Sequence, residues 1–143
     1  MPNLRKVLVT GAAGFIASRV TAQLLNAGVE VVAIDNYNDA YDARLKHLRV
    51  KEFDGQEGLQ LIEGTIESAD LVDRVFAENR FDCVFNLAAR AGVRYSLVDP
   101  HVYFSTNVTG SLNLLQAMRS SDVKKLVIAS TSSLYAGLPM PFK

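Results

Sequence analysis

The feature of this sequence that most constrains its fold is a regular alternation between short apolar runs and segments of helical pattern. Five runs of strand length are separated by four stretches whose apolar residues recur at helical spacing. A strand, a helix and a second strand in that order form a crossover unit, whose strands pair in parallel with a fixed hand. The sequence therefore predicts an α/β fold, a doubly wound parallel sheet with helices on both faces. The expected strands are residues 4–10, 29–35, 59–63, 81–87 and 125–130.

Apolar stripes predict the buried faces of three expected helices. Gly28 follows the first helix and is expected to cap its C-terminus, and Pro100 is expected to begin the last one. The second helix, residues 39–50, is polar and basic, so a solvated face is expected. The stripes are Ile16, Val20, Leu24 and Ala27, then Leu71, Val72, Val75 and Phe76, then Val108, Leu112, Leu115 and Met118, and the expected solvated residues are Arg44, Lys46, Arg49 and Lys51.

The composition fits one ordinary globular domain. The chain has 143 residues, of which 49% are hydrophobic and 21% charged, so it can bury a sizeable core. Lysine plus arginine and aspartate plus glutamate both number 15. A net charge of zero gives no electrostatic reason to expect nucleic acid or an anionic membrane as a partner. We expect residues 1–143 to form a single domain.

The sequence shows no signal for export, membrane insertion or metal binding. No stretch approaches the roughly 18 apolar residues that a membrane-spanning helix needs, and no secretory signal is visible. Cys83 is the one cysteine, so no internal disulfide can form, which suits a cytoplasmic location. His47 and His101 lack Cys, His or Asp partners at ligand spacing, so no metal site is expected.

A glycine turn, VLVTGAAGFIA, joins the first expected strand to the first expected helix. In a dinucleotide site, one glycine permits a tight turn, the next lets the backbone approach the pyrophosphate, and the helix N-terminus supplies free N–H groups. Gly11 and Gly14 have this placement, with Ala17 completing a G-x-x-G-x-x-A pattern. A turn without a ligand is the alternative. A loop of the G-x-x-x-x-G-K-[ST] type is excluded because no Lys-Ser or Lys-Thr follows.

Asp35 ends the second expected strand, at about the distance from the glycine turn where a carboxylate meets the adenosine ribose of a dinucleotide. Its two acceptor oxygens can take both ribose hydroxyls. Its charge would repel a 2′-phosphate, and residue 36 is asparagine rather than arginine, so NAD is favoured over NADP. A surface aspartate that happens to follow a strand is the alternative.

Together these segments resemble the extended short-chain dehydrogenase/reductase family, and within it the NAD-dependent nucleotide-sugar epimerases and dehydratases. TGAAGFIA resembles the family's TGxxGFIG, and DNYNDAYDARLK the region after the second strand in UDP-glucuronate 4-epimerases. NLAARAGVRYS is similar to their HLAAxAGVRxS, and PHVYFSTNVTGSLNLL to their helix with an NxxGxxN/L pattern. The resemblance covers the whole chain and implies a Rossmann-type sheet, NAD as cofactor and a UDP-sugar as substrate.

The resemblance also implies the residues of the cofactor site. The glycine turn would meet the pyrophosphate, the end of the second strand the adenosine, and Thr65 and Ile66 the adenine. Here Gly-Thr-Ile replaces the family's Gly-Asp-Ile, so a hydroxyl stands where the family has a carboxylate. The implied set is Gly11, Gly14, Phe15, Ile16, Asp35, Asn36, Thr65, Ile66, Leu87, Ala88, Ala89 and Asn107.

The same resemblance implies a sugar pocket beside the cofactor. Aligning STSSLY with the family's S-[ST]-x-x-[VL]-Y puts Thr131 at the catalytic position that hydrogen-bonds the sugar 4-hydroxyl; a polar strand end is the alternative. Ser132 and Ser133 stand where related dehydratases carry Asp-Glu and decarboxylases Ser-Glu, which favours simple epimerisation. The implied substrate residues are Gly92, Val93, Arg94 and Ser132, and for Arg90 and Arg94 a solvated arginine is the alternative.

The family's proton acceptor is the tyrosine of a Tyr-x-x-x-Lys motif, and none of the tyrosines in these 143 residues has a lysine four positions later. We therefore expect an NAD-binding domain that is truncated after about five strands, lacks the substrate domain and does not epimerise alone. A non-catalytic dinucleotide-binding module and a fragment of a nucleotide-sugar dehydratase or decarboxylase are the alternatives. An uncovered apolar face on the last helix and an edge strand after it predict a homo-oligomer.

Overall fold

Five parallel strands form one sheet in the order β3-β2-β1-β4-β5. The computed structural model describes residues 4–141. Because β1 lies between β2 and β4, the chain winds first to one side of β1 and then to the other, which confirms the predicted doubly wound sheet. The strands are β1 (Lys6–Thr10), β2 (Glu30–Asp35), β3 (Leu59–Glu63), β4 (Cys83–Asn86) and β5 (Leu126–Ile128).

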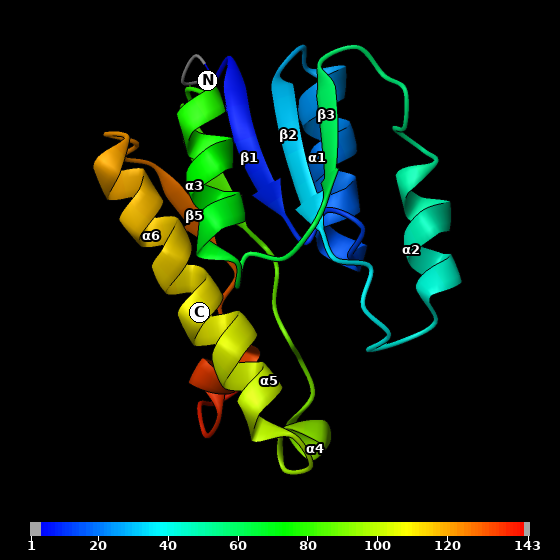
Figure 1. Cartoon of the computed structure of the whole chain (residues 1–143). Coiled ribbons are helices and arrows are strands. Elements are labelled where there is room, and N and C mark those ends of the chain that lie inside the picture. The colour runs from blue at the N-terminus through cyan, green and yellow to red at the C-terminus, as the bar shows by residue number, and fades with distance from the viewer. Residues whose placement is uncertain (1–3, 142–143) are drawn as a thin grey trace.

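Helices cover both faces of this sheet (Figure 1). Helices α3 and α6 pack on one face, and α1 and α2 on the other. A π-helical segment, Ser105–Gly110, joins α5 to α6 in one continuous rod, and a 3-10 turn follows at Ser132–Tyr135. The helices are α1 (Phe15–Asn26), α2 (Ala43–Val50), α3 (Ala69–Glu78), α4 (Val93–Ser96), α5 (Pro100–Phe104) and α6 (Ser111–Ser120).

Alternate residues of the strands face opposite helical layers, so the central strands are buried on both sides. In β1, Leu8 faces the core of α3 and α6, whereas Val7 and Val9 face α1. All three side chains are fully buried. Since apolar side chains fill both faces of the sheet, polar groups can gather only where the strands end. The register sets Thr10 beside Ile34 and Asn86, so β1, β2 and β4 end together.

The buried face of α1 lies one residue further along than the sequence predicted. Ala17, Ser18, Thr21 and Leu25 are buried, whereas the expected Ile16 is exposed. Of the predicted stripe, Leu24 packs against the core and Val20 is half-buried, whereas Ile16 and Ala27 are exposed, so the prediction is correct only in part. The small side chains on the buried face let the helix lie close against the sheet. The expected C-terminal cap is confirmed: Gly28 has a φ of +76° and its N–H donates to Leu25 at 2.9 Å.

Helix α2 begins at Ala43, four residues after the predicted start. The side chains of Asn36, Asn38 and Asp42 each accept a hydrogen bond from a backbone N–H two residues ahead, at 3.0 to 3.2 Å. Such local bonds compete with helix formation, so residues 36–42 form a run of tight turns. Asp42 then caps the first turn of the helix.

The last two helical predictions had different outcomes. Every stripe residue of α3 is buried, and α5 begins at Pro100 with the Asp99 side chain as its cap. In α6 only Met118 of the expected stripe is buried, and its neighbours on the sheet side are Leu114 and Ala117. A π-helical turn holds one extra residue, which changes the phase of a stripe that runs through it. Val108, Leu112 and Leu115 are about half exposed, at 49%, 52% and 49%, which agrees with the uncovered apolar face expected for the last helix.

Candidate functional site

The candidate site lies at the carboxyl ends of β1 and β4, where the winding of the sheet reverses. Loops that leave neighbouring strands in opposite directions open a crevice at such a point, and ligands of α/β sheets bind there. The glycine turn follows β1 and residues 87–89 follow β4. Both segments line one cleft, together with the end of β2.

The glycine turn lies directly against the backbone that follows β4. Gly11 has a φ of +70°, and a Cβ there would come 2.8 Å from the Cα of Ala88, so only glycine fits. The N–H of Gly14 donates to the carbonyl of Gly11 at 2.8 Å and closes the turn. The turn therefore brings the backbone, rather than side chains, to the floor of the cleft.

Helix α1 presents an uncapped N-terminus to this cleft. Its N-cap is Gly14, which has no side chain to accept from the first turn, and no acidic residue lies in that turn. The first N–H groups of a helix lack intrahelical partners and carry the positive end of the helix dipole, which together favour an anion. Phe15 and Ile16 supply backbone N–H groups here, while their side chains, 76% and 61% exposed, do not line the cleft.

Asp35 joins the end of β2 to the glycine turn. One carboxylate oxygen accepts the N–H of Ala13 at 3.0 Å and the other accepts the N–H of Tyr37 at 2.8 Å. The sequence suggested that both oxygens are available to ribose hydroxyls, and each is instead already used once by the backbone. A carboxylate has about four acceptor positions, and because the Lys46 ammonium also approaches Oδ1, at 3.5 Å, the position left open to a ligand is the second one on Oδ2.

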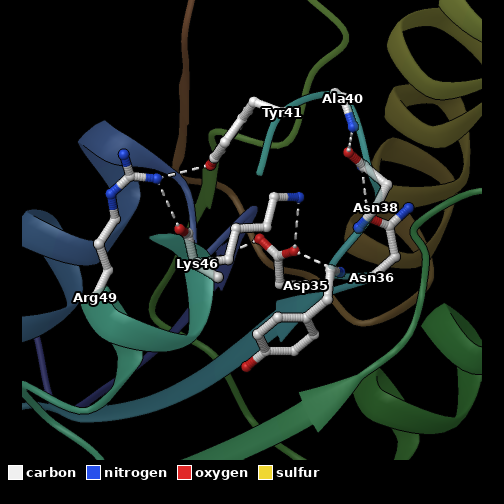
Figure 2. A network of polar contacts seen from close by, with 9 residues as sticks. Asp35, Asn36, Asn38, Ala40, Tyr41, Lys46 and Arg49 are labelled. Carbon is white, nitrogen blue, oxygen red and sulfur yellow. Dashed lines mark hydrogen bonds and ion pairs between the residues drawn. The ribbon is translucent and has the colours of Figure 1, made fainter. Parts of the chain in front are cut away.

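Lys46 is a charged site residue that the sequence did not predict. Its ammonium lies 3.5 Å from Oδ1 of Asp35, and both side chains are only 5% exposed (Figure 2). The predicted solvated face is thus wrong for Lys46, although it holds for Arg44, whose side chain is 88% exposed. Lys51 is also exposed. The one available signal was a basic residue eleven positions after Asp35, and the direction of its side chain depended on where α2 begins.

Arg49 also turns toward the site rather than to solvent. Its guanidinium donates to the carbonyl of Ala13 at 3.4 Å and to the hydroxyl of Tyr41 at 2.7 Å (Figure 2). It also lies over the Tyr41 ring, with its Cζ 5.3 Å from the ring centroid. Arg49 therefore links the glycine turn to the loop between β2 and α2, which forms one wall of the cleft.

Most of the residues proposed for a cofactor come together in this first cleft. Thr65 and Ile66 also line this cleft, as does Thr106 from the π-helical segment. Phe15, Ile16 and Asn107 do not line it. The predicted residues that do are Gly11, Gly14, Asp35, Asn36, Thr65, Ile66, Leu87, Ala88 and Ala89, and the lining residues not predicted include Asn38, Ala40, Tyr41, Lys46 and Thr106.

Glu67 fixes the Thr65 wall to the helical rod. Its carboxylate accepts from the hydroxyls of Ser105 and Thr106, at 2.5 and 2.7 Å. Burial alone would raise the pKa of this carboxyl. The hydrogen bonds from Ser105 and Thr106, a longer one from Thr65 and the charge of Arg90 outweigh it, so the pKa lies below its ordinary value of 4.5.

A buried polar network holds the loop after β4. Thr10 donates from its hydroxyl to Oδ1 of Asn86 at 2.8 Å and accepts the N–H of Ala88 at 3.2 Å. The Asn86 amide donates in turn to Ser111 on α6 at 3.0 Å. Because Ala88 lines the cleft, this network sets the position of the cleft floor.

A second cleft adjoins the first and shares Ala88 and Ala89 with it. Three predicted substrate or catalytic residues line it, namely Gly92, Val93 and Thr131. Arg94 is exposed and does not line it, and the side chain of Ser132 lies outside the described part of the structure. Arg90 also lines this cleft, and its Nε is buried without a hydrogen-bond partner among the described residues.

Two predicted residues of the second cleft also make local hydrogen bonds. The Asn107 side chain accepts the N–H of Arg90 at 2.8 Å and donates to its carbonyl at 3.0 Å, so it clamps the loop backbone. The Thr131 hydroxyl accepts the N–H of Ser133 at 3.1 Å. This local hydrogen bond is the kind expected if Thr131 were only a polar residue at the end of a strand. That hydroxyl keeps its own hydrogen for another acceptor.

Two other features have no counterpart in the described part of the chain, a membrane-spanning helix and a metal centre. Within residues 4–141, no helix is both long and apolar enough to cross a membrane. In the same range, no three His, Cys, Asp or Glu side chains lie close enough together to hold a metal ion.

Comparison with known proteins gives relatives in one family. The model of the NAD dependent epimerase/dehydratase family matches residues 7–142. UDP-glucuronate 4-epimerase from Thermodesulfobacterium geofontis is 48% identical over 135 residues, which are 94% of this chain and 42% of that protein. UDP-glucuronate 4-epimerase 3 from Arabidopsis thaliana is 41% identical over 130 residues, which are 90% of this chain and 30% of that protein. The chain thus spans less than half the length of these curated relatives.

Solved structures agree with this assignment. UDP-glucuronic acid 4-epimerase from Bacillus cereus, in complex with UDP-glucuronic acid and NAD, superposes with a TM-score of 0.82 at 34% identity and covers 92% of this chain and 41% of that one. UDP-glucose 4-epimerase from Thermus thermophilus, in complex with NAD, has a TM-score of 0.79 at 36% identity and covers 96% and 42%. The chain described here belongs to the NAD dependent epimerase/dehydratase family.

Proposed function

We propose that this chain is the NAD-binding portion of a UDP-sugar 4-epimerase. The observation that carries the proposal is the convergence, in one cleft, of the Gly11 turn, the uncapped α1 N-terminus and the Asp35 carboxylate. Each supplies what a different part of a dinucleotide requires: room for the backbone to approach, N–H donors for the pyrophosphate, and acceptors for a ribose. Relatives that carry NAD in their crystal structures share this part of the fold.

The residues present fit that cofactor. The turn and the first N–H groups of α1 would hold the pyrophosphate, and Asp35 would accept from the adenosine ribose. Thr65 and Ile66 would contact the adenine, and the Leu87–Ala89 segment would lie along the nicotinamide half. A side chain on Gly11 would collide with Ala88, so this part of the floor is backbone that can approach phosphate closely.

NAD, when bound, would accept a hydride from C4 of the sugar and return it to the other face. The chain's own part is to place the sugar beside the nicotinamide, which the sharing of Ala88 and Ala89 by the two clefts favours. In the second cleft, Thr131 has a hydroxyl hydrogen to donate to a sugar oxygen. These 143 residues hold no Tyr-x-x-x-Lys motif, so we propose that they bind without epimerising.

The proposal is tested by titrating the 143-residue chain with NAD⁺ in a calorimeter. We expect saturable binding of one NAD⁺ per chain, and a loss of at least about tenfold in affinity for Asp35→Ala, because hydrogen bonds to a charged acceptor are lost. Asp39→Ala, at an exposed position of the neighbouring loop, is the matched control. No saturable heat at millimolar NAD⁺ would contradict the cofactor assignment.

A second measurement tests the absence of turnover. The chain is incubated with NAD⁺ and UDP-glucuronate, UDP-glucose or UDP-galactose, and the products are separated to detect the C4 epimer. We expect no epimer above the level of the protein-free control. Turnover at an ordinary enzymatic rate would contradict the proposal that this chain binds the cofactor without completing the reaction.

A further inference from the structure

Asp35 and Lys46 are the only charged side chains that are buried in the described part of the chain. They reach the same point from different elements, Asp35 from the end of β2 and Lys46 from the first half of α2. Burying a charge is unfavourable unless it is paired, so the pair requires a physical explanation. Both side chains line the first cleft.

The carboxylate does not depend on the lysine for its stability. Two backbone N–H groups already donate to it, from Ala13 and Tyr37, at 3.0 and 2.8 Å. These bonds are shorter than the 3.5 Å between the ammonium and Oδ1, which is at the outer limit of a hydrogen bond. The backbone N–H groups therefore hold the Asp35 carboxylate more closely than Lys46 does, and the long contact with Lys46 is not needed to hold it in place.

The ammonium itself is left with unused donors. It carries three N–H groups, and Oδ1 of Asp35 is its one hydrogen-bond acceptor among the described residues. The Tyr41 ring, with its centroid 5.3 Å away, adds a weak attraction to the cation and no acceptor. A buried cation with free donors, at the wall of a cleft, has the chemistry to bind an oxygen of a ligand.

We propose that Lys46 is a specificity residue for the adenosine ribose of the dinucleotide, and that it makes the site more tolerant of a 2′-phosphate. This inference rests on the proposed function. Asp35 and Lys46 present an acceptor and a donor side by side, which suits two neighbouring hydroxyls. The positive charge also offsets the repulsion that Asp35 alone would exert on a phosphate, which carries about −1.5 to −2 charges.

Two substitutions at this position should change the preference in opposite directions. Lys46→Met keeps the length and apolar stem but removes the cation, so the affinity for NAD⁺ should fall about tenfold and that for NADP⁺ by a larger factor. Lys46→Arg keeps the charge and offers a fork that matches phosphate, so the ratio of the two affinities should move toward NADP⁺. Lys51→Met, at the exposed end of the same helix, should leave both affinities unchanged.

The experiment is calorimetric titration of the 143-residue chain and the three variants with NAD⁺ and with NADP⁺, after circular dichroism has established the folded fraction of each. The inference is supported if the ratio of NADP⁺ affinity to NAD⁺ affinity falls in Lys46→Met and rises in Lys46→Arg. If Lys46→Met does not fold, the direction of the change in Lys46→Arg decides. A ratio of affinities unchanged within twofold in the folded variants, with NAD⁺ still bound by the wild type, would overturn the role of Lys46 alone. If the wild type binds neither dinucleotide, the proposed function fails together with this inference.

Discussion

The backbone N–H of Ala13 donates to Oδ2 of Asp35 at 3.0 Å, and this bond ties the glycine turn to the end of the neighbouring strand β2. The other oxygen holds the N–H of Tyr37 at 2.8 Å, at the start of the loop that forms the cleft wall. One carboxylate thus fixes the floor and the wall before any ligand is bound. The proposed ribose acceptor is also part of the scaffold, so changes at Asp35 should affect stability as well as binding.

Asp35→Asn should therefore destabilise the free protein. An amide offers one acceptor oxygen where two are used, and it leaves the Lys46 ammonium buried without a counter-charge. We expect the free energy of unfolding to fall by about 1–3 kcal/mol, measured by urea denaturation at pH 7. Asp39→Asn, on the exposed part of the loop, is the control and should lie within about 0.5 kcal/mol of wild type. Equal stabilities for wild type and Asp35→Asn would show that the turn holds without the carboxylate.

Two buried threonines allow a matched test of the network under the cleft floor. Thr10 and Thr21 are both fully buried, but the Thr10 hydroxyl is bonded to Asn86 and Ala88 while the Thr21 hydroxyl has no partner among the described residues. Thr10→Val should cost about 1–3 kcal/mol because it leaves Asn86 unsatisfied. Thr21→Val should be neutral or stabilising, because it removes a hydroxyl that is buried without a bond. Equal costs in thermal or urea unfolding would contradict this account of the network.

The carboxylate of Glu67 should make stability depend on pH. Its pKa lies below 4.5 in the folded protein, so the ionised form is favoured by folding. The stabilisation is complete above about pH 4.5 and is lost as the pH falls through the lower pKa of the folded state. Glu67→Gln should therefore reduce the free energy of unfolding at pH 7, and its difference from wild type should shrink between pH 7 and acid pH values below 4.5. A difference from wild type that stays constant between these pH values would contradict the assigned role.

Glu78→Gln is the control for this comparison, because Glu78 is exposed at the end of α3. It should leave the pH dependence of the unfolding free energy close to that of wild type. A similar loss in both variants would point to net charge rather than to the bonds with Ser105 and Thr106.

The exposed apolar face of the α5–α6 rod should mediate self-association. Phe104, Val108, Leu112 and Leu115 lie three or four residues apart and are between about half and two thirds exposed, at 64%, 49%, 52% and 49%. Contiguous apolar surface of this kind favours contact with a second copy. We propose a homo-oligomer at micromolar concentration, measured by light scattering. Leu112→Lys should shift it to monomer. Gln23→Lys, which adds the same charge at an exposed position of α1 on the opposite face of the sheet, should not. A monomeric wild type would contradict the proposal.

The sequence predicted the sheet and the centre of the site because local patterns determine both. Apolar runs mark the strands, and the spacing of Gly11, Gly14 and Asp35 follows from how a strand, a turn and a helix fit together. Lys46 could not be found in this way, because its burial depends on the turns at Asn36 and Asn38 that delay the start of α2.

Contacts between distant segments were also beyond the sequence. The hydrogen bond between Thr10 and Asn86 joins residues 76 positions apart, and no local sequence pattern predicts such a contact. The half exposure of Leu112 and Leu115 agrees with the uncovered apolar face that the sequence predicted for the last helix, but the π-helical turn at Ser105–Gly110 was not predicted. Packing of whole elements, rather than local propensity, decides such features.

The most direct test of the central claim is an NMR titration of the isotope-labelled chain with NAD⁺, which reports on each backbone amide. We predict the largest shifts at the glycine turn and the first turn of α1, around Asp35, and at Leu87–Ala89, with little change in α3. Shifts that avoid the Gly11 turn and Asp35, or no shifts at saturating NAD⁺, would contradict the claim that this cleft holds the dinucleotide.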